Sequence, residues 1–355
     1  MERYVPINKG NYADMETEER RAAFEANRGF GWEKEYKVYR AHWMEYPKRQ
    51  YVGEYPLNLD IELSTICNLH CPMCYTITEM FQSRVNRQLM APALFYKIID
   101  EIAGKVPAVR LSLRGESTLH PNFVEFIRYC KRRGIPEVSF LTNCSTMSGG
   151  FFCKVAEAGA DWITLSIDGM GETYERIRKP LKFEDTLQKV REIKRIKDDL
   201  GLKRPVIKIQ SVWPAIRENA EEFYNTFVPY VDLIAFNPMI DFGANDRGVY
   251  EEGFVCPQLF QRMVIGSDGM ALCCSNDENG MVVIGDANQE SIYELWHGER
   301  RMEVLKAHKA GNYQQIGLCR ECYLPRKTVV DEYGTINGRT FPIRNYVKGG
   351  GSSER

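Results

Sequence analysis

Three cysteines, Cys67, Cys71 and Cys74, have the spacing in this chain that most clearly predicts chemistry. They form a C-x3-C-x2-C pattern directly after a strand-like run, and three thiolates can hold one [4Fe–4S] cluster. One iron then lacks a protein ligand, which suits the binding of a small molecule. The alternatives are half of a zinc site or a redox-active pair. Zinc needs further ligands, and the nearby His70 lies inside the loop.

The cysteine spacing resembles the signature of the radical SAM superfamily. In that family the open iron chelates the amino and carboxylate groups of S-adenosylmethionine, and reduction splits this cofactor to a 5′-deoxyadenosyl radical. The resemblance also implies a reductant of the flavodoxin or ferredoxin type. Met73 stands where many relatives carry an aromatic residue against the adenine, and its thioether can also pack on a purine.

The segment Leu113–Pro121 resembles the Gly-Gly-Glu-Pro segment of the family, which hydrogen-bonds the amino group of the cofactor. Gly115 and Glu116 match that pattern, whereas Arg114 and Ser117 stand in place of its first glycine and its proline. The resemblance implies that Glu116 accepts charge-assisted hydrogen bonds from the ammonium group.

Further cofactor contacts are implied near the ends of the next two predicted strands. Asn143, Ser166 and Asp168 resemble family positions around the ribose and carboxylate of the cofactor. Arg178 resembles an arginine that reaches this carboxylate, and a guanidinium matches a carboxylate in bidentate geometry. Considered alone, Arg178 reads as a solvated charge at a helix end.

A second cysteine group consists of Cys256, Cys274, Cys319 and Cys322, with gaps of 17, 44 and 2 residues. With a Gly-x4-Cys step at Cys274, it resembles the SPASM and twitch auxiliary domains. The spacing is similar to the single-cluster twitch domain of the butirosin-pathway dehydrogenase of 2-deoxy-scyllo-inosamine. One auxiliary [4Fe–4S] cluster without an open iron is implied, which favours electron transfer. A structural zinc site is the alternative, and Cys273 competes with Cys274 as ligand.

Strand-like and helix-like stretches alternate between residues 57 and 236 and predict six strand–helix units. Parallel strands with right-handed crossovers follow from this order, and eight such units would close a full barrel. The predicted fold class is α/β, an open six-unit TIM-like barrel with a small C-terminal iron–sulfur domain. The predicted strands are 57–63, 108–113, 137–142, 162–167, 206–212 and 232–236.

The domain boundaries follow from changes in composition and pattern. We predict an N-terminal helical extension (1–55), the radical SAM barrel (56–245), the auxiliary cluster domain (250–330) and a C-terminal tail (331–355). The extension reads as one or two helices over 17–39 that pack on the main domain or form a lid. In the auxiliary domain we expect a hairpin at 263–273 and a helix over 292–309. The glycine-rich last residues are typical of disorder.

Composition limits the functional classes. The chain has 355 residues, 44% of them hydrophobic, and a net charge of −1, which favours neither nucleic acid nor an anionic membrane as partner. No apolar run approaches the roughly 20 residues of a membrane-spanning helix, and no signal peptide is apparent. Eleven cysteines without an export signal indicate the cytoplasm and metal ligation.

The combination predicts abstraction of hydrogen from a substrate C–H bond. An auxiliary cluster that accepts the second electron favours oxidation of a carbohydrate or aminocyclitol alcohol to a ketone. A thiol that returns hydrogen, with Cys144 and Cys273 as candidates, would favour epimerisation instead. Modification of a ribosomal peptide is a further alternative, and a non-catalytic metal-binding scaffold is disfavoured by the complete cysteine and Glu116 set. Cys130 and Cys153 read as core residues.

Overall fold

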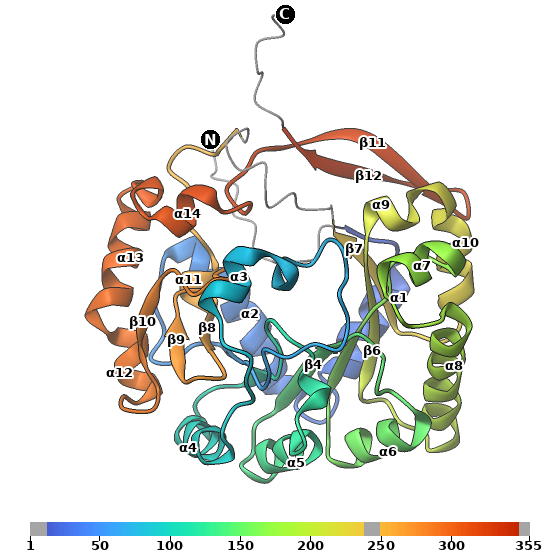
Figure 1. The fold of residues 1–355 in the computed structure, drawn as a ribbon, viewed down its shortest axis with the longest axis horizontal. Helices are drawn as coiled ribbons and strands as arrows, with labels where there is room; N and C mark the ends of the chain where they lie inside the picture. Colours follow the sequence, from blue (N-terminus) through green and yellow to red (C-terminus); the bar gives the residue numbers. More distant parts are fainter. Residues whose placement is uncertain (1–12, 238–248, 348–355) are drawn as a thin grey trace, which may run out of the picture.

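A single curved sheet forms the centre of the computed structural model, which describes residues 13–237 and 249–347 (Figure 1). Its strands are β1 (Ala13–Asp14), β2 (Asn58–Ile61), β3 (Ala108–Arg110), β4 (Glu137–Thr142), β5 (Trp162–Ser166), β6 (Val206–Val212), β7 (Leu233–Asn237), β8 (Arg262–Ile265), β9 (Met270–Leu272) and β10 (Val283–Asp286). Strands β2 to β7 are neighbours in chain order, and all their pairings are parallel. This arrangement confirms the α/β open barrel.

Helices surround the sheet on its outer face, as Figure 1 shows for α4, α5, α6 and α8. The helices are α1 (Glu18–Arg28), α2 (Glu33–Arg49), α3 (Glu79–Arg84), α4 (Pro92–Ile102), α5 (Phe123–Arg132), α6 (Gly149–Glu157), α7 (Gly171–Ile177), α8 (Phe183–Asp199), α9 (Trp213–Ile216), α10 (Ala220–Phe227), α11 (Gln258–Gln261), α12 (Ile292–His297), α13 (Glu299–Lys309) and α14 (Gly317–Glu321). In α8, Leu187, Val190 and Ile193 recur at helical spacing and are buried. Within the described ranges, no helix is long and apolar enough to cross a membrane.

The two faces of the sheet differ in polarity. Outward-facing residues such as Val138, Phe140 and Ile163 are fully buried in the main hydrophobic core beneath the helices. Alternate residues such as Ser139 and Thr164 point to the barrel interior, because successive side chains of a strand face opposite sides. A closed eight-stranded barrel fills its interior with branched apolar residues. Here the interior is polar and contains a cavity.

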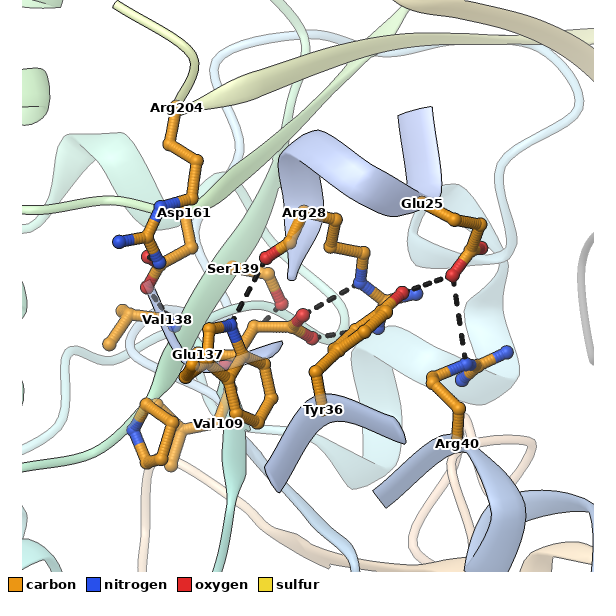
Figure 2. A network of polar contacts seen from close by, with 12 residues as sticks. Glu25, Arg28, Tyr36, Arg40, Val109, Glu137, Val138, Ser139, Asp161 and Arg204 are labelled. Carbon is orange, nitrogen blue, oxygen red and sulfur yellow. Dashed lines mark hydrogen bonds and ion pairs between the residues drawn. The ribbon is translucent and has the colours of Figure 1, made fainter. Parts of the chain in front are cut away.

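The two N-terminal helices close the end of the barrel at which the parallel strands begin. Arg28, the last residue of α1, donates hydrogen bonds of 2.6 and 2.8 Å to Glu137, the first residue of β4, and both side chains are buried (Figure 2). Tyr36 of α2 donates to Glu25 of α1, which joins the helices. Of the two alternatives for the extension, the structure therefore shows packing on the main domain.

The auxiliary domain continues the barrel sheet. Strand β8 pairs in parallel with β2, and β9 pairs with β8 as the antiparallel hairpin that the sequence predicts. The helix expected over 292–309 is two helices, α12 and α13, separated by Gly298 in an extended conformation.

The predicted C-terminal tail contains ordered structure, which corrects that assignment. Residues 328–346 form a hairpin of β11 (Thr328–Ile336) and β12 (Arg339–Tyr346), which crosses one side of the molecule in Figure 1. The ring of Phe341 contacts Trp213 and Phe236 at the edge of the barrel, so apolar contacts fix the hairpin there. The predicted disorder at 349–355 lies outside the described residues.

Candidate functional site

The loop with Cys67, Cys71 and Cys74 leaves β2 at the carboxyl end of the parallel strands. Cys71 is buried and the other two thiols are half-buried. Burial raises the pKa of Cys71 to about 11, and the charges of Cys74 and Cys67 raise it further while Arg178 lowers it. The three thiols therefore lie within electrostatic reach of one another. Among the described residues, however, no three His, Cys, Asp or Glu side chains are close enough to hold a metal ion.

The backbone of the cysteine loop is fixed by the segment that follows β3. Gly115 and Glu116 donate their N–H groups to the carbonyls of Ser64 and Ile66 at 3.1 and 2.9 Å. A Cβ atom at Gly115 would lie 2.4 Å from the Ser64 oxygen and 2.6 Å from the Ile66 oxygen. Only glycine permits this approach, because backbone atoms, unlike flexible side-chain ends, cannot move aside. Gly115 thus positions the loop.

We expect Gly115→Ala to destabilise the protein by about 1–3 kcal/mol, because the added methyl group forces two backbone segments apart. Cluster incorporation should fall with it, since the displaced backbone carries the cysteine loop. Thermal unfolding and iron content after reconstitution measure both effects. Gly150→Ala is the matched control, because open space surrounds its Cβ position in α6. A Gly115→Ala protein as stable and iron-rich as the wild type would contradict this role.

Glu116 is hydrogen-bonded through its N–H to Ile66 at the start of the cysteine loop and is 3% exposed. Its carboxylate accepts hydrogen bonds from the Thr118 hydroxyl at 2.6 Å and from the Asn143 N–H at 2.7 Å. Burial raises the pKa of Glu116, while these donors lower it. The Asn143 side chain in turn donates to Asn68 at 2.9 Å and to the Cys67 sulfur at 3.7 Å. The structure therefore brings together the predicted Gly115, Glu116 and Asn143 with the cysteine loop.

Arg178 and Asp168 form an ion pair within electrostatic reach of Cys71. Two nitrogens of Arg178, Nε at 2.8 Å and Nη2, donate hydrogen bonds to the same carboxylate oxygen of Asp168. The other Asp168 oxygen accepts from the Val212 N–H at 3.0 Å. Burial lowers the pKa of Arg178, but the charges of Asp168 and Cys71 outweigh this and raise it. Arg178 is therefore held near the cysteines as a cation, and Asp168 positions it. Ser166, at the end of β5, is half-buried.

A buried ion pair that the sequence analysis did not predict connects the barrel to the auxiliary domain. Arg114 donates two hydrogen bonds of 2.5 Å to Glu62, the residue after β2. Glu62 also accepts from the N–H and hydroxyl of Ser267, in the turn between β8 and β9, at 3.0 and 3.2 Å. Arg114 stands where the family segment has its first glycine, and this difference was the only feature of the sequence that pointed to the ion pair.

The second cysteine group comes from three segments: Cys256 precedes α11, Cys274 follows β9, and Cys319 and Cys322 lie in and directly after α14. The Cys319 thiol lies within electrostatic reach of Cys273, Cys256 and Cys322, and burial raises its pKa strongly. Cys274, which the sequence analysis preferred over its neighbour Cys273, is also buried. None of the eleven cysteines is in a disulfide.

Two buried polar side chains donate hydrogen bonds toward this second group. His308 is 1% exposed, and its Nδ1 accepts the Cys256 N–H at 3.2 Å. The proton of the neutral ring therefore lies on Nε2, which faces the Cys319 sulfur at 3.3 Å. Burial lowers the pKa of His308 to about 4, so the ring is neutral. Asn276 donates to the Cys322 sulfur at 3.3 Å.

These donors suit thiolates that ligate a cluster, since hydrogen bonds to sulfur are one means by which proteins adjust an iron–sulfur centre. His308 is 52 residues from Cys256, and Asn276 is 46 residues from Cys322. The sequence analysis found neither residue, because no local spacing pattern connects them to the cysteines.

The two candidate hydrogen donors are both in the core. Cys144 is 1% exposed and Cys273 4%. Burial raises the pKa of each thiol to about 12. Cys144 also has a positive φ of 68°, and its carbonyl accepts from Lys189 at 3.1 Å. These surroundings favour a packing role for both thiols.

Two sequence profiles match the chain. The profile of the radical SAM superfamily matches residues 61–223, and the iron–sulfur cluster-binding domain called SPASM matches residues 256–323. This chain belongs to the radical SAM superfamily. Its cofactors are S-adenosylmethionine and two [4Fe–4S] clusters. The Arg178 cation and the donors His308 and Asn276 suit these groups in charge and in hydrogen bonding.

Known proteins resemble this radical SAM enzyme along most of its length. It is 26% identical over 311 residues to the tungsten-containing aldehyde ferredoxin oxidoreductase cofactor-modifying protein of Pyrococcus furiosus, covering 81% of this chain and 84% of the relative. The crystal structure of BtrN in complex with AdoMet and 2-DOIA has a TM-score of 0.53 at 16% identity, covering 75% and 92% of the two chains. Streptococcus suis SuiB bound to precursor peptide SuiA has a TM-score of 0.51 at 14% identity, covering 81% and 76%. Such identities support the fold alone.

Proposed function

We propose that this radical SAM enzyme oxidises an alcohol carbon of a carbohydrate or aminocyclitol to a ketone. When bound, the first cluster with S-adenosylmethionine would supply the radical chemistry that abstracts hydrogen from the substrate carbon, and the auxiliary cluster would supply an acceptor for the second electron. For each ketone formed, a flavodoxin- or ferredoxin-type reductant would give one electron to the first cluster. The substrate radical would give one electron to the auxiliary cluster and lose its hydroxyl proton to solvent.

The chain's own residues divide the work of the first site. We propose that Glu116 accepts from the ammonium group of the cofactor and that Arg178 binds its carboxylate in place of part of its contact with Asp168. Asn143 and Ser166 would contact the ribose, and Met73, which is half-buried, would pack on the adenine. These roles match the charges of the groups: the Glu116 carboxylate would meet the positive ammonium group, and the Arg178 guanidinium would meet the negative carboxylate of the cofactor.

The auxiliary cysteine group is the main support for oxidation as the reaction. We propose Cys256, Cys274, Cys319 and Cys322 as its ligands, a set that leaves no iron open to substrate and suits electron acceptance. The donors His308 and Asn276 support this role, because hydrogen bonds to ligand sulfurs influence the reduction potential. The burial of Cys144 and Cys273 gives less support to epimerisation.

A second candidate is modification of a cofactor used by another enzyme. The Pyrococcus furiosus relative is named for such an activity, and its similarity extends over 81% of this chain. Peptide modification is supported only by the fold shared with SuiB. Cysteine thiolates that ligate clusters must stay reduced, and the cytoplasm keeps thiols reduced. We therefore propose that the protein is cytoplasmic.

Deuterium transfer tests the proposed reaction. The anaerobically reconstituted protein, with about eight iron and eight sulfide per chain, is incubated with S-adenosylmethionine, a reductant and polyols deuterated at each alcohol carbon. We expect deuterium in 5′-deoxyadenosine and a ketone product in equal amounts. About four iron with one zinc would contradict the electron-acceptor role. Transfer from a peptide or cofactor instead of any polyol would contradict the substrate class.

A further inference from the structure

The inner face of α13 contains an arginine that the site described above does not use. The buried residues of this helix are Arg301, Val304, Leu305 and His308. Arg301 and His308 are about two helical turns apart, so they lie on the same side of the helix. Because His308 faces the Cys319 sulfur, this side of α13 is turned toward the second cysteine group.

The guanidinium of Arg301 has neutral hydrogen-bond partners and is 1% exposed. Its Nη1 donates to the Trp296 carbonyl at 2.6 Å, and its Nη2 donates to the Leu259 carbonyl. The Cζ atom also lies 3.4 Å from the centroid of the Trp296 ring, a cation–π contact. Carbonyl groups and an indole ring orient the cation, but they do not neutralise its charge.

No carboxylate compensates this charge in the part of the chain that the structure describes. The Cys273 thiol is the only group there whose charge favours the cationic form of Arg301. Burial lowers the pKa of Arg301 to about 9, which leaves the guanidinium charged at neutral pH. Asp277, a buried acid near these cysteines, instead accepts from the N–H groups of Met281 and Val282 at 2.6 and 2.7 Å. A buried charge is costly without an opposite charge, so an anion beside Arg301 would be stabilising.

We propose that Arg301 is the counter-charge of the auxiliary cluster and raises its reduction potential. Arg301 lies within electrostatic reach of Cys273, which is in turn within reach of Cys256 and Cys322. Thiolate ligands make a [4Fe–4S] cluster anionic, and one-electron reduction makes it more so. Net charge is one of the factors that set the potential of such a cluster, and a fixed buried cation favours the reduced state.

This inference rests on the proposed function and deepens it. A cluster that accepts an electron from a substrate radical benefits from a raised potential. On this account, one face of α13 provides both the charge of Arg301 and the N–H group of His308. The hydrogen bonds of Arg301 to the Trp296 and Leu259 carbonyls would by themselves be met by an uncharged amide. A neutral side chain at this position therefore separates the electrostatic role from a structural one.

Potentiometric titration of the reconstituted full-length protein, followed by electron paramagnetic resonance, tests the proposal. Added S-adenosylmethionine changes the signal of the cluster that binds it, which identifies the auxiliary signal. We expect Arg301→Gln to lower the equilibrium constant for reduction of the auxiliary cluster by about tenfold or more, a shift of about 59 mV for one electron. Arg300→Gln removes the same charge from the exposed neighbouring position and should stay within about twofold, because solvent and salt screen that charge.

Two further variants distinguish charge from packing. Arg301→Met should shift the midpoint as far as Arg301→Gln, because both lose the cation. Arg301→Lys should stay within about twofold of the wild type, since the anionic cluster favours the charged ammonium. If the neutral variants retain too little iron to titrate, Arg301→Lys should still restore both the iron content and the midpoint.

The outcomes separate this proposal from the proposed reaction. A wild-type midpoint in Arg301→Gln, a shift confined to Arg301→Met, or a failure of Arg301→Lys to restore the midpoint would overturn the counter-charge. None of these results involves turnover, so each leaves oxidation of the substrate intact. The expected midpoint shifts in a protein that forms no ketone would contradict the oxidation alone.

Discussion

Cys71→Ala is expected to reduce the formation of 5′-deoxyadenosine to below about one hundredth of the wild-type rate. Changes to residues behind the ligands of a metal already cost 10–100-fold, and this variant removes one of only three thiolates. Cys71 is also the most buried of the three, so water cannot readily replace its sulfur. The measurement is anaerobic incubation with S-adenosylmethionine and dithionite, followed by chromatography of the products.

Cys153→Ala is the matched control for this variant. Its thiol lies half-buried on α6, away from both cysteine groups, and the variant should cleave S-adenosylmethionine at the wild-type rate. Iron analysis of Cys71→Ala should still show about four iron per chain from the auxiliary cluster. Retained cleavage in Cys71→Ala would contradict the assignment of the cysteine loop.

The strands of the barrel could be predicted closely because apolar residues recur at alternate positions within short stretches that turn residues bound. The predicted ranges 137–142 and 206–212 coincide with β4 and β6. The local order of strand and helix also determined the parallel pairing, since crossovers place successive strands side by side. Cysteine spacing predicts the first cluster site in a similar way, because its three thiols lie within one loop. The second group spans residues 256–322, and its prediction depends on the resemblance to auxiliary cluster domains.

Contacts between distant segments could not be predicted in this way. Arg114 meets Glu62 across 52 residues, and His308 meets Cys256 across the same separation. The hairpin of β11 and β12 was missed because its strands include many polar residues and only three that are buried. Its position depends on Phe341 reaching the barrel, a contact that only the folded chain defines.

Cys319→Ala is expected to separate cleavage of S-adenosylmethionine from oxidation of substrate. The first cysteine group is unchanged in this variant, so 5′-deoxyadenosine should still form at a measurable fraction of the wild-type rate. Ketone formation should fall by at least about 100-fold, because the auxiliary site loses a thiolate and the His308 hydrogen bond loses its acceptor. The ratio of ketone to 5′-deoxyadenosine, measured with the polyol that transfers deuterium, therefore drops from near one toward zero.

Paired variants of the neighbouring cysteines complete this test. If Cys274 is a ligand, Cys274→Ala should reproduce the Cys319→Ala ratio and lose auxiliary iron, whereas Cys273→Ala should keep both. The reverse pattern would assign the ligand to Cys273, whose thiol lies within electrostatic reach of Cys256 and Cys322. An unchanged product ratio in Cys319→Ala would contradict electron acceptance by the auxiliary cluster. The substrate radical would then need another acceptor or a hydrogen donor, and epimerisation would become the better account of the reaction.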